Sequence, residues 1–296
     1  MVPEFPKFKN ITIKDKELID SMVLEYPPYC DFNFLNIYCW NAKYSKTKFS
    51  MLNNNLVISM LDFTTDNQIC SFIGNNNTLD TINRLLEKFQ TLTMVPEICI
   101  TEQIKHSKHI DIIEDRNNFD YILSLKNLTL LKGRKFKSKK KNAARFLSGA
   151  PNHNIKIIDL ANSKIRVDLI ELCKRWAKLK KLRLEDVRRE LYAIKLLLNT
   201  AHLCKMVNIG IYDNKKLIGF VTNEIRGEYA MGAFGKANTN YEGIYSYLEH
   251  ASAKILIKYG CKYLNYEQDL GIINLRKTKL AWRPAFFLKK YIIKKH

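Results

Sequence analysis

The sequence of 296 residues contains no apolar run that approaches the roughly 20 residues needed to cross a lipid bilayer. It also begins without the positively charged and apolar pattern of a secretory leader. These absences predict a soluble, cytoplasmic protein. Peripheral contact with the inner face of the membrane is the alternative location.

Paired cysteines are missing as well. The seven cysteines are scattered, with no C-x-x-C spacing and no cluster of histidines beside them. This pattern predicts reduced, mostly buried thiols and no metal site. No Ser-His-Asp or Cys-His pairing is evident, so we expect no covalent intermediate. Structural roles are expected for His106, His109, His153, His202 and His250.

Acidic residues are few beside the basic ones, 29 against 49, which gives a formal net charge of +20. This imbalance favours a polyanionic partner: nucleic acid, an anionic membrane surface or a phosphate-rich cofactor. Drift in a composition rich in Lys, Asn and Ile is the alternative explanation. The hydrophobic fraction of 46% is ample for a packed core, so a disordered chain is excluded.

Strand and helix patterns alternate along the chain, which predicts an α/β fold with mixed sheets. In the first half, strand patterns at residues 56–61 and 69–73 precede a helical pattern over 79–92. The second half shows a similar order, with strand patterns at 154–160, 229–234, 263–266 and 288–293, helical patterns at 165–182, 186–202 and 242–259, and a hairpin over 207–223. The repeated order predicts two similar domains, residues 1–150 and 151–296.

Residues 132–145 form the densest charge run and contain no acid. Apolar residues at positions 136, 143 and 146 predict a helix with one buried edge. We expect the run to contact a polyanion, and a merely solvated face is the alternative.

Residues 265–284 combine acids and bases at a suggestive spacing. Glu267 follows a strand pattern, Asp269 comes two residues later, and Gly271 allows a sharp turn. Arg276 and Lys279 are three residues apart and so share one helix face. The pattern predicts a site that binds an anionic group and manages a proton beside it. A surface ion-pair network is the alternative.

Several motifs resemble one bacterial family, and the resemblance covers nearly the whole chain. They lie at residues 16–28, 114–125, 131–142 and 267–280. The family is the one related to the C-terminal catalytic domain of phosphatidylglycerol lysyltransferases. The resemblance implies two tandem GNAT-type acyltransferase domains, as in the Fem-type peptidyltransferases. It further implies an aminoacyl-tRNA donor, and a lipid headgroup such as phosphatidylglycerol or a peptidoglycan precursor as acceptor.

Two departures from the family pattern bear on these expectations. Relatives that modify phosphatidylglycerol usually carry a membrane-embedded region ahead of this domain, and the sequence begins at the domain, which disfavours a lipid acceptor. GNAT domains that use acetyl-CoA have a Gly-rich turn before a helix, whose amides hold the pyrophosphate. Here Gly235 and Gly243 have a different spacing. Gly243 either frees the helix start for a phosphate or an acyl carbonyl, or forms a simple turn.

The resemblance and the charge pattern together predict roles for particular residues. Glu267 or Asp269 is expected to be the base or to orient the acceptor, while Arg276 and Lys279 bind phosphate or the oxyanion. The residues expected to bind the donor or substrate are Lys236, Asn238, Gly243, Tyr245 and Asn265. The residues expected to hold tRNA or anionic lipid are Lys135, Lys139 and Lys140.

Two other functions remain open from the sequence. An N-acyltransferase that uses acyl-CoA or an acyl carrier protein would share the fold and the carboxylates. A non-catalytic module would use the basic surface to bind nucleic acid or a membrane. Aminoacyl transfer needs no cofactor, because aminoacyl-tRNA is its donor substrate. The N-acyltransferase alternative would use CoA.

Overall fold

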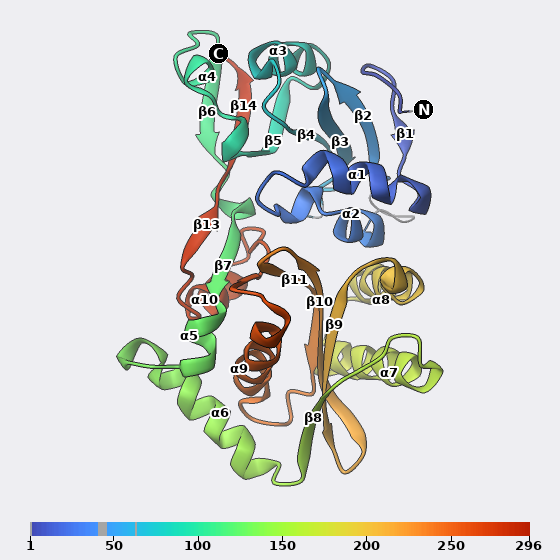
Figure 1. Ribbon diagram of the computed structural model, residues 1–296, viewed down its shortest axis with the longest axis vertical. Helices are drawn as coiled ribbons and strands as arrows, with labels where there is room; N and C mark the ends of the chain where they lie inside the picture. The colour runs from blue at the N-terminus through green and yellow to red at the C-terminus, as the bar shows by residue number, and fades with distance from the viewer. Residues whose placement is uncertain (1, 41–45, 63) are drawn as a thin grey trace. The chain divides into compact units, whose positions relative to one another are not determined.

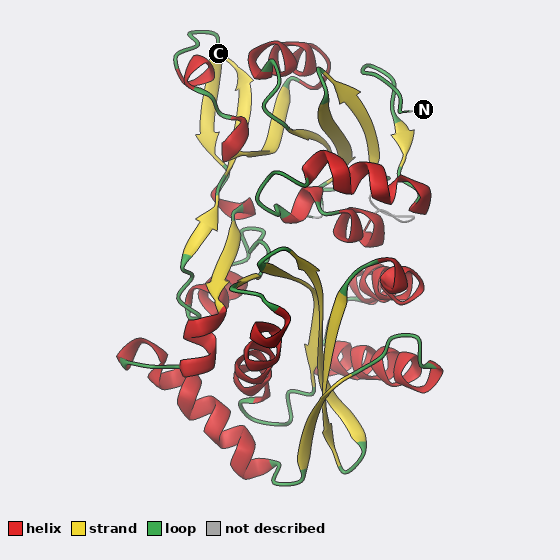
Figure 2. Cartoon of the chain, in the orientation of Figure 1, coloured by secondary structure: helices red, strands yellow, loops and turns green. Residues whose placement is uncertain are grey.

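The computed structural model describes residues 2–40, 46–62 and 64–296, which form two compact units (Figures 1 and 2). Unit 1 comprises residues 1–121, 267–277 and 287–296, and unit 2 comprises residues 122–266 and 278–286. Each unit therefore contains segments from both halves of the sequence. The expected division into residues 1–150 and 151–296 differs from these units because the chain returns to unit 1 after residue 266.

Unit 1 contains two sheets, with strand orders β1-β2-β3-β4 and β5-β14-β6. The C-terminal strand β14 lies between β5 and β6 and pairs antiparallel with both. The helices and strands of unit 1 are β1 Lys9–Asn10, α1 Lys16–Val23, α2 Phe34–Trp40, β2 Lys48–Leu52, β3 Asn55–Leu61, β4 Gln68–Ile73, α3 Thr78–Phe89, β5 Thr91–Pro96, α4 Glu102–Lys105, β6 Ile110–Glu114 and β14 Lys290–Lys295.

Unit 2 is built on a seven-stranded sheet with the order β13-β7-β12-β11-β10-β9-β8. Its own elements are α5 Leu125–Leu130, α6 Lys137–Gly149, β8 His153–Ile157, α7 Ser163–Leu179, α8 Leu184–Thr200, β9 Met206–Asp213, β10 Lys216–Arg226, β11 Tyr229–Ala237, α9 Ile244–Leu256 and β12 Tyr263–Asn265. Helix α9 covers one face of this sheet, and α7 and α8 lie on the other (Figure 1). Three elements run across the unit boundary: β7 Asp120–Ser124, α10 Ile273–Leu280 and β13 Phe286–Leu288.

Local sequence explains much of this framework. The predicted hairpin over residues 207–223 is confirmed as β9 and β10, and Asn214 and Lys215 in its turn both have positive φ. Most of the basic run lies in α6, which buries Ala143 and Phe146, and Phe136 just before the helix is also buried, as predicted. No helix among the described residues is long and apolar enough to span a membrane.

The sheet of unit 2 opens between β11 and β12. These parallel strands pair only from Tyr229 to Met231 on β11 and along Tyr263–Asn265 on β12. Beyond Met231, β11 continues to Ala237 paired with β10. Because Tyr266 is the first residue after β12, it lies where the two strands separate. Helix α9 connects the same two strands in the sequence, so its side chains are placed beside this opening.

Candidate active site

Asp269 is the centre of a polar cluster in unit 1. Its side chain is fully buried, and Arg276 binds its two oxygens through Nε at 2.9 Å and Nη2 at 2.8 Å. Arg116 Nη1 lies 3.1 Å from the same carboxylate. The Tyr121 hydroxyl and the Gly271 amide also donate to it. The structure thus places Asp269 and Arg276, two of the expected site residues, in direct contact.

These contacts fix the charge of Asp269. Burial acts to raise its pKa, but the hydrogen bonds from Arg276, Tyr121 and Gly271 outweigh burial and hold the pKa below its usual range. A carboxylate with a lowered pKa and occupied acceptor positions is a poor proton acceptor. Asp269 is therefore suited to orient the guanidinium groups of Arg116 and Arg276, which keep 33% and 32% of their side-chain surfaces exposed.

Glu267 belongs to the same loop but has a different partner. Its side chain accepts a hydrogen bond from Asn36 Nδ2 at 2.8 Å, and Asn36 lies on α2 of unit 1. The loop is tight: Glu267, Leu270 and Gly271 all have positive φ. A left-handed backbone is uncommon in residues other than glycine and needs support from the surrounding structure. Glu267 is half-buried, so part of its side chain reaches the surface.

Lys279 lies in unit 2 and is part of a separate cluster. It is buried, its ammonium donates to the carbonyl oxygen of Tyr266, and it lies 5.1 Å from the centre of the Tyr266 ring. The Tyr266 hydroxyl donates to Glu249 Oε1 at 2.8 Å. Lys139 of α6 stacks over the Trp282 ring at 4.2 Å. Lys139 and Lys279 both act electrostatically on Glu249, so the two cations occur in the same region of unit 2.

Glu249 is a titratable group that the sequence analysis missed. It lies on α9 and is only 5% exposed. Burial raises its pKa to about 7, although the Tyr266 hydrogen bond and the charges of Lys139 and Lys279 oppose the rise. The sequence carried one usable signal: Tyr245 and Glu249 are four residues apart, hence on one face of a largely apolar helix.

Lys236 and Tyr245 form a second polar group beside the opening of the sheet. Lys236 Nζ lies 2.5 Å from Glu190 of α8 and 4.1 Å from the centre of the Trp176 ring. The Tyr245 hydroxyl accepts from the Ala237 amide at 3.2 Å, and burial raises the pKa of Tyr245 to about 12. Glu190 was also missed in the sequence, because its partner lies 46 positions away.

The other residues expected to bind substrate are Asn238, Asn265 and Gly243. Asn238 is buried, and its side chain accepts from the Asn240 amide at 3.1 Å. Asn265 is fully buried within β12. Gly243 precedes α9 with φ 81°, and a Cβ there would lie 1.8 Å from the Asn142 carbonyl oxygen. Only glycine permits this approach of α9 to α6.

The basic run presents most of its cations to solvent. Lys135 and Lys140 are exposed, whereas Lys139 is half-buried against Trp282. No acidic residue occupies the first turn of α6, although four lysines lie within its first five residues. Cations at a helix N-terminus are unfavourable, because the helix dipole is positive there. An anionic partner would offset this repulsion.

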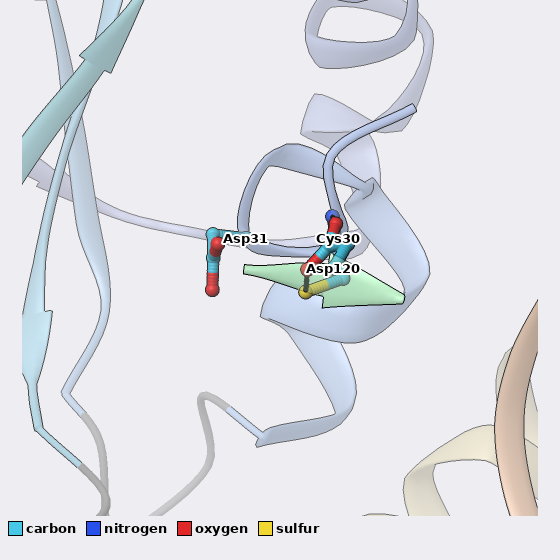
Figure 3. Close-up of side chains that lie close together, drawn as sticks. All are labelled: Cys30, Asp31 and Asp120. Atoms are coloured by element: carbon cyan, nitrogen blue, oxygen red, sulfur yellow. Dashed lines mark hydrogen bonds between the residues drawn. The ribbon is translucent and has the colours of Figure 1, made fainter. Parts of the chain in front are cut away.

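A second cluster in unit 1 contains Cys30, Asp31 and Asp120 (Figure 3). Their ligand-type atoms lie within 4.8 Å of one another, as metal ligands do. Lys290 of β14 provides the cation, since its ammonium donates to Asp31 and lies 2.7 Å from Asp120 and 3.5 Å from Cys30 Sγ. Burial opposes the charge on Lys290, but Asp120 and Asp31 outweigh it and hold its pKa well above the usual range. This cluster is a buried ion-pair network that joins β14 to Asp31 and to Asp120 at the start of β7, within unit 1.

Comparison with known protein families adds a finding independent of these contacts. The model described as "Phosphatidylglycerol lysyltransferase, C-terminal" matches residues 26–294. The chain belongs to this family. The match includes every residue expected at the site, from Lys135 to Lys279. A search of curated proteins found no match.

Solved structures of other proteins share the fold of this family member. A conserved protein from Bacteroides thetaiotaomicron has a TM-score of 0.84 and 24% identity, with all of both chains covered. The C-terminal domain of a protein described as a lysylphosphatidylglycerol synthetase from Agrobacterium fabrum has a TM-score of 0.63 and 10% identity, over 96% of this chain and 92% of that one. FemX has a TM-score of 0.60 and 9% identity, over 98% and 97%.

The role of Asp269 can be tested by stability. We expect Asp269→Ala to lower the free energy of unfolding by about 2–3 kcal/mol, because two partly buried guanidinium groups lose their shared carboxylate. Urea unfolding at neutral pH measures the change. Asp186→Ala is the control, since Asp186 pairs with Arg183 at the surface and its loss is expected to cost under about 1 kcal/mol. Equal losses in the two variants would identify the Asp269 cluster as a solvated network.

Proposed function

We propose that this protein is an acyltransferase that moves an aminoacyl group from aminoacyl-tRNA to an amine or hydroxyl acceptor. The family match over residues 26–294 carries the proposal. The acceptor would be a lipid headgroup, such as phosphatidylglycerol, or a soluble or peptide molecule. Fold similarity to FemX and to the Agrobacterium fabrum domain supports the same class of protein.

The proposal extends to the architecture, with each unit a GNAT-type domain. In unit 1, helix α3 connects β4 to β5, and these strands belong to different sheets. In unit 2, helix α9 connects β11 to β12, and these strands separate after three residue pairs. Both units thus contain a strand-helix-strand segment whose two strands are not paired along their full length. Such an opening gives an acyl donor access to the backbone of the first strand.

A tRNA donor is supported by the charge of the protein. The net charge is +20, and the exposed lysines of α6 lie at a helix N-terminus that lacks an acidic residue. Binding of these lysines to phosphates would release counterions and so favour a polyanion. We propose that Lys135, Lys139 and Lys140 contribute to this contact, with the location cytoplasmic or at the inner membrane surface.

The chemistry requires a proton acceptor and cations for the developing oxyanion or the phosphates. Between the two acids of the loop, Glu267 is the better proton acceptor, because the carboxylate of Asp269 is already occupied by its donors. Arg276, held by Asp269, would bind phosphate. Lys279 and Lys236 would act at the opening of unit 2, where both ammonium groups are positioned by other residues.

The test incubates the purified protein with total lipid, soluble extract and tRNA charged with radioactive amino acids. The radioactivity in the lipid fraction, the soluble fraction and the tRNA is then measured. We expect the purified protein to move label into one of the two fractions faster than spontaneous hydrolysis releases it. Label that stays on tRNA at the rate of a protein-free control would contradict an aminoacyl-tRNA donor. A parallel reaction with labelled acyl-CoA tests the CoA-dependent alternative.

A further inference from the structure

The Glu249 cluster of unit 2 contains a buried carboxylate to which the proposed function assigns no role. Glu249 projects from α9, where it is 5% exposed, and accepts a hydrogen bond from the Tyr266 hydroxyl at 2.8 Å. Burying a carboxylate is unfavourable unless it is paired and hydrogen-bonded. An apolar residue would fill the same helix position without this cost.

The contacts connect Glu249 to the place where the sheet opens. Tyr266 is the first residue beyond the paired segment of β11 and β12. Its side chain binds Glu249, and its backbone carbonyl accepts from the ammonium of Lys279. One tyrosine therefore joins the buried carboxylate to a lysine at the strand ends. The Tyr266 ring also lies 5.1 Å from that ammonium, within the range of a cation–π contact.

Charged or titratable groups from three other elements act on Glu249. Lys139 comes from α6, Lys279 from α10 and Tyr266 from the end of β12. Tyr245 lies one turn earlier on α9 and interacts electrostatically with Glu249. The two cations favour the ionised carboxylate, whereas burial favours the neutral acid. This opposition brings the pKa of Glu249 to about 7, where small pH changes alter its charge.

We propose that Glu249 is a positioning residue that, in its ionised form, holds the Lys279 ammonium at the opening of β11 and β12 through Tyr266. This role rests on the proposed aminoacyl transfer, in which Lys279 stabilises the oxyanion or a phosphate. The carboxylate fixes the Tyr266 hydroxyl and thereby the orientation of the tyrosine whose carbonyl binds Lys279. It also attracts the ammonium directly. Protonation of Glu249 removes this attraction and loosens both the Tyr266 side chain and the Lys279 ammonium.

The kinetic test compares Glu249→Gln, Tyr266→Phe and the double variant. Glutamine keeps the size of the side chain and an acceptor oxygen but cannot ionise. We expect each single variant to lower kcat roughly 10- to 100-fold with little change in the KM for charged tRNA. A misplaced Lys279 ammonium would stabilise the transition state less well while leaving substrate binding almost unchanged. The double variant should be no slower than the slower single variant, because both substitutions break the same connection.

The pH profile separates positioning from mere structural support. In the natural protein, kcat should rise with pH through about 7, and Glu249→Gln should lack this step. Glu224→Gln is the matched control, since Glu224 is another buried glutamate of unit 2 and lies on β10. It should keep the natural profile. A step that persists in Glu249→Gln, or multiplicative losses in the double variant, would overturn the proposal.

A measurement without substrate keeps this inference separate from the proposed reaction. An amine-selective reagent is applied to the folded protein above pH 7, and labelling of Lys279 is quantified by mass spectrometry. We expect Lys279 to be labelled several-fold faster in Glu249→Gln than in the natural protein, with Lys262 as an exposed internal reference. Equal labelling would disprove the positioning role even if transfer occurs. Faster labelling without transfer would support the role of Glu249 in holding Lys279 and reject aminoacyl transfer.

Discussion

Lys290→Met is expected to lower the free energy of unfolding by about 3–5 kcal/mol, the range for removing one partner of a buried ion pair. Lys290 and Asp120 have no exposed side-chain surface, and Asp31 is 10% exposed. Methionine fills a similar volume but leaves two carboxylates without their cation. The Cys30 thiol gives no compensation, because burial and then Asp120 and Asp31 hold its pKa well above the usual range. Denaturant unfolding at neutral pH measures the loss.

The neighbouring residue provides a matched control. Lys289 pairs with Glu114 at 2.9 Å, but 41% and 52% of their side-chain surfaces are exposed. We expect Lys289→Met to change stability by less than about 1 kcal/mol, because solvent already screens the pair. If the two substitutions cost the same, the cluster around Lys290 must be hydrated and its ion pairs weak.

Glu249→Gln is expected to stabilise the folded protein above pH 7 by roughly 3 kcal/mol, relative to its effect below pH 4.5. Burial raises the pKa of Glu249 from 4.5 to about 7, so the folded state binds the proton more tightly than the unfolded state. The resulting stability is present below pH 4.5 and is lost as pH rises toward 7. A change of one unit in pKa corresponds to about 1.36 kcal/mol, so the rise from 4.5 to about 7 gives a stability difference of roughly 3 kcal/mol. Glutamine removes this loss.

The measurement is the difference in unfolding free energy between the two proteins at several pH values. Glu171→Gln is the control, since Glu171 pairs with Lys174 and 55% of each side chain is exposed. Its effect should vary little with pH. A difference between Glu249→Gln and the natural protein that stays constant from acid to neutral pH would show that Glu249 titrates normally. The same data show whether the variant used for kinetics remains folded.

Much of the framework followed from local sequence patterns. The helices expected at 165–182 and 186–202 correspond to Ser163–Leu179 and Leu184–Thr200, and the final strand expected at 288–293 corresponds to Lys290–Lys295. Apolar spacing and turn residues act over a few positions, so a linear reading detects them. The expected buried state of the cysteines is confirmed for six of seven, with Cys204 half-buried. Strand order cannot be read in this way, because β14 pairs with strands about 200 residues earlier.

The candidate site was only partly accessible to the same reasoning. Asp269 and Arg276 were both named as site residues because one short loop and helix carry them, although their ion pair was not predicted. Arg116 and Tyr121, which complete the cluster, lie about 150 positions earlier. Glu249 was missed for a different reason, since an acid in a helix usually faces water, and its place on a largely apolar helix was the one local sign of burial. Residues whose roles depend on distant partners emerge only once the fold is known.

The place of β14 determines the order in which the units can be completed during synthesis. The strand fills the middle of the β5-β14-β6 sheet in unit 1, although it follows every other described strand of either unit in the sequence. The continuous segment 122–266, with β8 to β12, is available earlier and supplies most of unit 2. Until β14 emerges, Asp120 and Asp31 lack Lys290 and the edges of β5 and β6 lack their shared partner. The β5-β14-β6 sheet of unit 1 can therefore be completed only after the continuous segment of unit 2 has been made.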